Sequence, residues 1–129
     1  MLQPPNVVGL KLCQQVIVEE ESRNVTLVNC FRKLSFAEFP AKAARFFICV
    51  VLRDGKGEGT LTLAINSLVD LEEVWSRSWS LAFTDPLAER WFAVPVDDCE
   101  FPEEGSYEVE LAADGDPIGR ALIEVSVQG

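Results

Sequence analysis

The clearest constraint on the fold lies near the C-terminus, where apolar and polar residues alternate one by one between residues 101 and 127. In residues 106–113 glutamates occupy one parity, and apolar or aromatic side chains occupy the other. This two-residue period is typical of a β-strand with one buried and one solvated face. Asp114-Gly115 then supplies a pair that tolerates positive φ, and the alternation resumes after Pro117. The segment therefore predicts a β-hairpin.

Tyr107 stands two residues after Gly105, where the penultimate strand of the predicted all-β chain begins. In immunoglobulin-like sandwiches a tyrosine at this place forms the tyrosine corner, in which its hydroxyl bonds to upstream backbone. The alternative is an edge aromatic residue without that bond, because the Cys and Trp marks of antibody domains are missing. The residues predicted to shape the hairpin are Tyr107, Gly105, Asp114 and Gly115.

Six upstream segments carry strand-like patterns: residues 7–18, 25–36, 46–52, 60–65, 75–83 and 91–96. Residues 46–52 are apolar on both parities, which predicts a central strand covered on both faces. Residues 75–83 are a second predicted central strand, and Pro95 places the last segment near an edge. About eight short strands without a convincing amphipathic helix predict an all-β fold, a two-sheet antiparallel β-sandwich, in a single domain over residues 1–129.

Acidic residues outnumber basic ones by 21 to 11, so the net charge is −10. A surface of that sign repels phosphate groups, which argues against nucleic acid or an anionic membrane as a partner. The chain contains no histidine, which excludes Ser-His-Asp and Cys-His catalytic arrangements within it. Paired carboxylates could do acid–base work, but nothing in the sequence places two of them across a cleft. The sequence therefore predicts a non-catalytic protein without a cofactor, and an enzyme with an unrecognised carboxylate site stays a minor alternative.

The cysteines lie far apart and form no C-x-x-C motif: Cys13, Cys30, Cys49 and Cys99. This spacing favours reduced, mostly buried thiols over a zinc site, and two disulfides are possible in number only if the chain is exported. The N-terminus lacks the basic and apolar regions of a secretion signal, and the longest apolar run, residues 46–52, is too short to cross a bilayer. These features predict a soluble cytoplasmic protein.

Turn and core residues occur in a definite order across nearly the whole chain: residues 25–31, Phe39-Pro40, the apolar strand from Phe46, residues 101–111 and Asp114-Gly115. This order resembles a family of small bacterial proteins of unknown function. The resemblance implies an immunoglobulin-like or C2-like sandwich in a bacterial cytoplasm, and it implies no reaction. The sequence departs from the family at Arg32, where an acidic residue is common after Phe31, and in its three tryptophans.

Trp75, Arg77 and Trp79 alternate with serines and form the strongest predicted interaction site. If this stripe faces outward, two indoles flank a guanidinium, a composition common at interface hot spots. If it faces inward, the indoles belong to the core and Arg77 must reach a carboxylate or an edge. Together with Trp91 of the next segment, the stripe predicts binding to a partner protein or to a second copy, through an aromatic sheet face or a free edge strand.

Acidic residues in two loops offer an alternative function, cation or ligand binding in the manner of C2 domains. One group precedes the final hairpin and the other lies in its turn: Asp97, Asp98, Glu100, Glu103 and Glu104, then Asp114 and Asp116. Calcium needs several such oxygens that converge, and in a sandwich these groups lie at opposite ends of one strand. No metal site is therefore predicted, and calcium binding stays the alternative.

Overall fold

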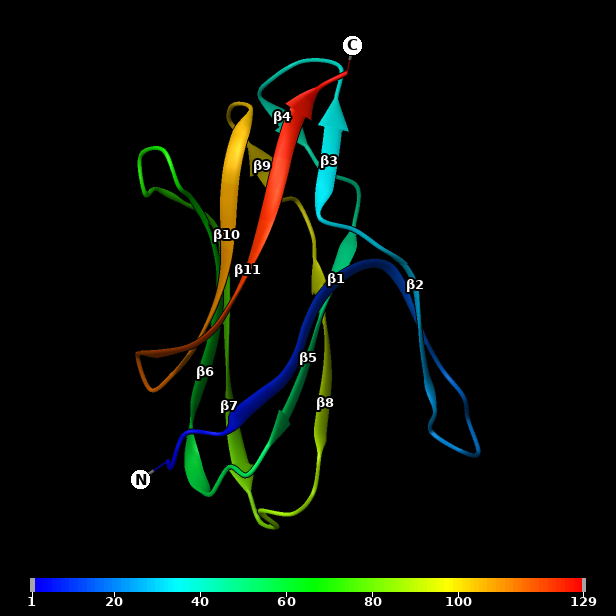
Figure 1. Cartoon of the computed structure of the whole chain (residues 1–129), viewed down its shortest axis with the longest axis vertical. Helices are drawn as coiled ribbons and strands as arrows, with labels where there is room; N and C mark the ends of the chain where they lie inside the picture. The colour runs from blue at the N-terminus through cyan, green and yellow to red at the C-terminus, as the bar shows by residue number, and fades with distance from the viewer. Residues whose placement is uncertain (1, 129) are drawn as a thin grey trace.

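The computed structural model describes residues 2–128, which form eleven strands and no helix, hence none that could span a bilayer (Figure 1). The strands are β1 (Asn6–Val18), β2 (Val25–Cys30), β3 (Lys33–Phe36), β4 (Ala41–Lys42), β5 (Phe46–Arg53), β6 (Gly57–Ser67), β7 (Glu73–Phe83), β8 (Arg90–Val96), β9 (Glu100–Phe101), β10 (Gly105–Ala113) and β11 (Asp116–Val127).

Hydrogen bonding arranges these strands into three sheets. A four-stranded sheet has the order β2-β1-β5-β8, and a five-stranded sheet has the order β3-β11-β10-β6-β7. The short strands β4 and β9 form a two-stranded sheet of their own. Neighbouring strands are antiparallel except β3 and β11, which run parallel.

Alternation along the strands gives each of the two larger sheets one buried apolar face. In the five-stranded sheet β6 buries Leu61, Leu63 and Ile65, and in the four-stranded sheet β5 buries Ile48 and Val50. All these side chains belong to one contiguous hydrophobic core. The two larger sheets therefore pack their apolar faces against one shared core. The prediction of an all-β fold is confirmed.

The strand expected over residues 25–36 is wrong as a single element. The structure divides it into β2 and β3, which lie in different sheets. The chain crosses between them at Phe31, whose ring packs edge-on against Phe46 with centroids 5.4 Å apart. An apolar side chain thus enters the core at the crossing, which the uniform strand-like composition does not reveal. This division, with β4 and β9, brings the number of strands to eleven rather than about eight.

The second central strand expected over residues 75–83 is also wrong, because β7 lies at a sheet edge and pairs with β6 alone. Its serines are exposed while Leu81 and Phe83 are buried, so only one face is covered. By contrast, β5 lies between β1 and β8 and is buried along nearly its whole length. The central strand expected over residues 46–52 is therefore confirmed.

The hairpin of β10 and β11 turns where its sequence predicts. Ala113 pairs with Asp116, so Asp114 and Gly115 form a two-residue loop with φ of 47° and 87°. Positive φ at both positions characterises a type I′ turn, and glycine takes the second position without strain on a Cβ atom. The Asp114 carboxylate also accepts the N–H of Thr60 at 2.8 Å, which ties the turn to β6.

Tyr107 is buried near the start of β10. Its hydroxyl donates to the backbone carbonyl of Glu103 at 2.6 Å, and its ring packs against Phe101 with centroids 4.9 Å apart. Gly105 lies between the bonded residues, with φ of 146° in the region that favours glycine. The bond to upstream backbone is the feature that distinguishes a tyrosine corner from an edge aromatic residue.

We expect Tyr107→Phe to lower the free energy of unfolding by about 1–2 kcal/mol, because the Glu103 carbonyl loses a buried donor. Urea denaturation measures the change. Ser126→Ala is the control, since it removes an exposed hydroxyl that lies 3.1 Å from the Ser35 hydroxyl. It should cost less than about 0.5 kcal/mol. Equal losses in the two variants would contradict a stabilising role for the Tyr107 hydroxyl.

Candidate interaction site

Trp75, Arg77 and Trp79 share the parity of Leu81 and Phe83, so they project from β7 toward the core side of its sheet. Both indoles are half-buried and pack against the hydrophobic core. Arg77 is exposed, because the edge position of β7 leaves its guanidinium a path to solvent. The inward alternative therefore holds for the two rings, and the cation lies at the rim.

Trp79 lies between the two larger sheets. Its ring contacts Phe92 of β8, with centroids 5.6 Å apart and an interplanar angle of 52°. Its indole Nε1 is buried and has no hydrogen-bond partner among residues 2–128. Buried donors in proteins are almost always paired, so an unpaired indole N–H is unusual. This donor is available to a ligand between the edge strands.

Trp91 lies on β8 with 48% of its surface exposed. Its partner on β5 is Val51, which places it on the outer face of the four-stranded sheet. The indole Nε1 donates to Glu89 Oε1 at 2.7 Å, which holds the ring in one orientation. A large, oriented and exposed aromatic side chain is typical of an interface anchor.

A groove of about 310 Å³ runs between the edge strands β7 and β8, and we call it the flank groove. It is lined by Arg77 and Trp79 from β7 and by residues 91–95 from β8. Three of the four predicted interaction residues, including Trp91, thus meet in one place. Trp75 is absent from the lining, and within residues 2–128 Arg77 stacks on no aromatic ring.

A second groove of about 590 Å³ lies between the β1–β2 hairpin and β8, and we call it the hairpin groove. In Figure 1 this hairpin projects away from the rest of the molecule, on the side of β8. Its lining includes Val16, Val18 and Val25 from the hairpin and Trp91 from β8. Trp91 therefore lines both grooves.

The charge of these linings is opposite to that of the chain as a whole. Arg77 lines the flank groove, Arg23 and Arg90 line the hairpin groove, and Glu89 is the one acidic residue in either lining. None of the three guanidinium groups pairs with a carboxylate of residues 2–128. In a chain of net charge −10, the grooves therefore offer a local attraction for anionic groups.

Arg90 is a site residue that the sequence did not single out. Its guanidinium lies over the rings of Phe83 and Phe92, 6.0 and 5.6 Å from their centroids, and donates to the Ala82 carbonyl at 3.0 Å. The side chain thereby joins β7 to β8. The sequence holds one signal for this role: Arg90 and Phe92 are two residues apart, so in a strand their side chains point to the same face.

One edge of β8 is free beside the grooves, because β8 pairs with β5 alone. Proline has no N–H, so Pro95 fits a position whose backbone donor would point away from the sheet. Trp91 and Ala93 share its parity, and backbone groups of one parity point to the same side of a strand. Their N–H and C=O groups are therefore directed to the open edge.

Two of the loop acids that the sequence offered for calcium form ion pairs with basic side chains. Asp97 pairs with Arg45 at 2.8 Å, and Asp98 pairs with Lys42 at 3.1 Å. In the part of the chain that the structure describes, no three acidic or thiol side chains converge in a way that could hold a metal ion.

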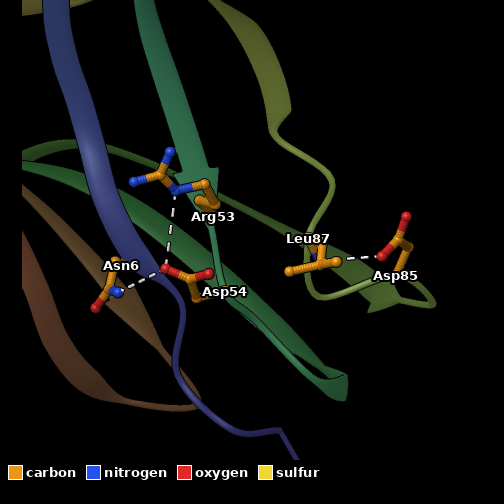
Figure 2. Close-up of polar contacts among 5 residues, drawn as sticks. All are labelled: Asn6, Arg53, Asp54, Asp85 and Leu87. Atoms are coloured by element: carbon orange, nitrogen blue, oxygen red, sulfur yellow. Dashed lines mark hydrogen bonds and ion pairs between the residues drawn. The ribbon is translucent and has the colours of Figure 1, made fainter.

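The acidic turns near the N-terminal end of β1 show the same use of carboxylates (Figure 2). Asp54 accepts the side-chain N–H of Asn6 at 3.0 Å and lies 3.8 Å from Arg53 Nε. Asp85 accepts the backbone N–H of Leu87 at 3.0 Å. Figure 2 shows the two carboxylates directed to separate partners, so these acids stabilise turns.

A family model matches residues 10–126, a range that includes both groove linings. The chain belongs to the family of unknown function DUF6941. The expected likeness to an uncharacterised family is thereby confirmed. No curated protein shows significant similarity to the chain. The description of DUF6941 names no activity.

Proposed function

We propose that this chain is a non-catalytic protein-interaction domain, which binds an extended segment of a partner protein along the free edge of β8. The observation that carries the proposal is the position of Trp91, which lines both grooves beside an unpaired strand edge. A segment added to such an edge gains backbone hydrogen bonds, and its side chains enter the flanking pockets.

Two grooves beside one strand suit a partner segment in β-conformation. Successive side chains of a strand point to opposite faces of a sheet. One parity of the bound segment enters the hairpin groove on the outer face, and the other enters the flank groove toward β7. In the flank groove the unpaired Nε1 of Trp79 is available to donate to a polar group of the segment.

The linings also define the composition of the segment. Val16, Val18, Val25 and Trp91 favour apolar side chains in the hairpin groove. The exposed guanidinium groups of Arg23 and Arg77 favour aspartate or glutamate beside them, whereas that of Arg90 is directed to β7. A second copy is a poorer occupant, because a symmetric contact brings the same cationic patch against itself. Nucleic acid is a poorer partner than an acidic protein segment, since the chain as a whole carries a charge of −10.

We further propose that the fold is an immunoglobulin-like sandwich of two layers, antiparallel except for the β3–β11 pair, and that the protein acts in a bacterial cytoplasm. The bond from Tyr107 to Glu103 and the core common to the two larger sheets support the immunoglobulin-like arrangement. Free thiols, three of them buried, suit a reducing compartment. A C2-like cation-binding role has less support, because Asp97 and Asp98 are paired with basic side chains.

Isothermal titration with two blocked peptides of equal length tests the proposal. One peptide alternates valine with glutamate, and the other alternates valine with lysine. We expect the glutamate peptide to bind more tightly, and its affinity to fall as added salt screens the arginines. Binding of neither peptide at millimolar concentration, or tighter binding of the lysine peptide, contradicts the proposal.

A third peptide separates strand pairing from simple charge attraction. It keeps the valine and glutamate side chains but carries N-methyl groups along one backbone edge, which removes the donors that an added strand uses. We expect it to lose most of the affinity. Equal affinity of the methylated and unmethylated peptides would show that β8 does not bind the segment as a strand.

A further inference from the structure

Cys13 and Cys30 lie directly opposite each other in the ladder of β1 and β2, where the hairpin leaves the sheet. Side chains of directly opposed residues lie on one face of an antiparallel pair. Cys13 is 0% exposed, whereas Cys30 is exposed to solvent. One thiol is therefore open to reagents, and its neighbour is shielded from them.

The backbone hydrogen bonds define the spacing of this pair. Phe31 donates its N–H to the Leu12 carbonyl at 2.9 Å, so these two residues form a hydrogen-bonded pair. Pair types alternate along an antiparallel ladder, so Cys13 and Cys30 are a non-hydrogen-bonded pair with Cα atoms about 4.5 Å apart. Disulfides span Cα separations of roughly 4.4–6.8 Å. The backbone therefore has a disulfide's spacing while the thiols are free.

We propose that Cys13 and Cys30 are an oxidation site, at which a peroxide converts two thiols into a cross-strand disulfide. The Cys30 thiolate attacks the peroxide O–O bond, forms a sulfenic acid and releases hydroxide. The Cys13 sulfur then displaces the sulfenic oxygen, which leaves as water, and the S–S bond forms. The two thiols together lose two electrons and two protons, and hydrogen peroxide is reduced to two molecules of water.

The other two cysteines are poor competitors. Cys49 lies opposite Lys11, hence diagonal to Cys13, at a Cα separation of about 7–8 Å that exceeds the usual disulfide range. Burial raises the pKa of Cys49 to about 11 and that of Cys99 to about 12. Both thiols are therefore largely protonated near neutral pH, as is that of Cys13, whose pKa burial also raises. Cys13 differs from them in that it lies directly opposite Cys30. Cys99 in addition lies within the hydrophobic core.

A bond between Cys13 and Cys30 closes residues 14–29 into a covalent loop. This loop contains Val16, Val18 and Val25, which line the hairpin groove. A cross-link of this kind stabilises the folded chain, chiefly because it restricts the unfolded one. This stabilisation by the disulfide depends only on residues of the chain itself. It is therefore expected whether or not a partner segment binds β8.

The test treats the full chain with hydrogen peroxide and follows free thiols, disulfide-linked peptides and the thermal midpoint. We expect two of the four thiols to disappear and one linked pair of peptides, containing Cys13 and Cys30, to form. The midpoint should rise by roughly 10 °C, and a reductant should reverse the rise.

Two variants complete the design. Cys49→Ser should form the same disulfide as the original chain, because Cys49 takes no part in it. Cys30→Ser replaces an exposed thiol, so it should fold with an unchanged midpoint and form no intramolecular disulfide. A link from Cys13 to Cys49, a dimer linked through Cys30, or an unchanged thiol count after peroxide treatment overturns the assignment.

Discussion

Trp91→Ala is expected to weaken binding of the valine–glutamate peptide by roughly 30-fold, which corresponds to the loss of about 2 kcal/mol at an interface anchor. The indole lines both grooves beside the free edge of β8, so truncation removes an apolar wall from each of them. Because the side chain is 48% exposed, the fold should be retained. Titration calorimetry of the variant measures the change.

Leu87→Ala is the matched control for this variant. It shortens an apolar side chain that is 84% exposed, in the loop before β8, and that lines neither groove. The peptide should bind Leu87→Ala as it binds the original chain. If both variants lose affinity equally, the peptide binds exposed apolar side chains in general, and binding in the grooves is contradicted.

Leu63→Ala is expected to lower the free energy of unfolding by about 3 kcal/mol, because a fully buried leucine leaves a cavity that its neighbours fill only in part. Leu63 is 0% exposed and pairs with Leu111 of β10 at the centre of the five-stranded sheet. It also belongs to the core that the two larger sheets share. Urea denaturation gives the value directly.

Leu122→Ala makes the same chemical change on β11 of the same sheet, at a side chain that is 53% exposed. It should cost less than about 1 kcal/mol. A similar loss of unfolding free energy at positions 63 and 122 would mean that both faces of the sheet are equally buried. That result would contradict a core shared by the two larger sheets.

The C-terminal hairpin was predictable because its determinants are local. The alternation over residues 106–113 reports burial of one face, and Asp114-Gly115 reports two positive φ values. The Tyr107 bond follows from the same short stretch, since its acceptor is the carbonyl of Glu103. In each case the residues that interact are near neighbours in sequence.

The features that could not be predicted depend on pairing between distant segments. Residues 25–36 have one strand-like composition, yet Phe31 packs on Phe46 and the chain changes sheets there. The edge position of β7 likewise follows from the order of strands in its sheet. A two-residue period indicates that a face is buried, but it does not identify the neighbouring strand.

The candidate site divides in the same way. Residue type singled out Trp79 and Trp91, but only the fold shows that they line one groove between β7 and β8. The β1–β2 ladder similarly places Cys13 opposite Cys30, although their spacing in the sequence forms no motif. Contacts across a sheet join residues that no local pattern relates.

The most direct test of the binding site is amide hydrogen exchange by NMR at Trp91 and Ala93, with and without the valine–glutamate peptide. Binding along the edge of β8 gives the outward N–H groups new acceptors, so exchange at both positions should slow when the peptide is added. Unchanged exchange at Trp91 and Ala93 in the peptide-saturated protein would contradict binding at this edge.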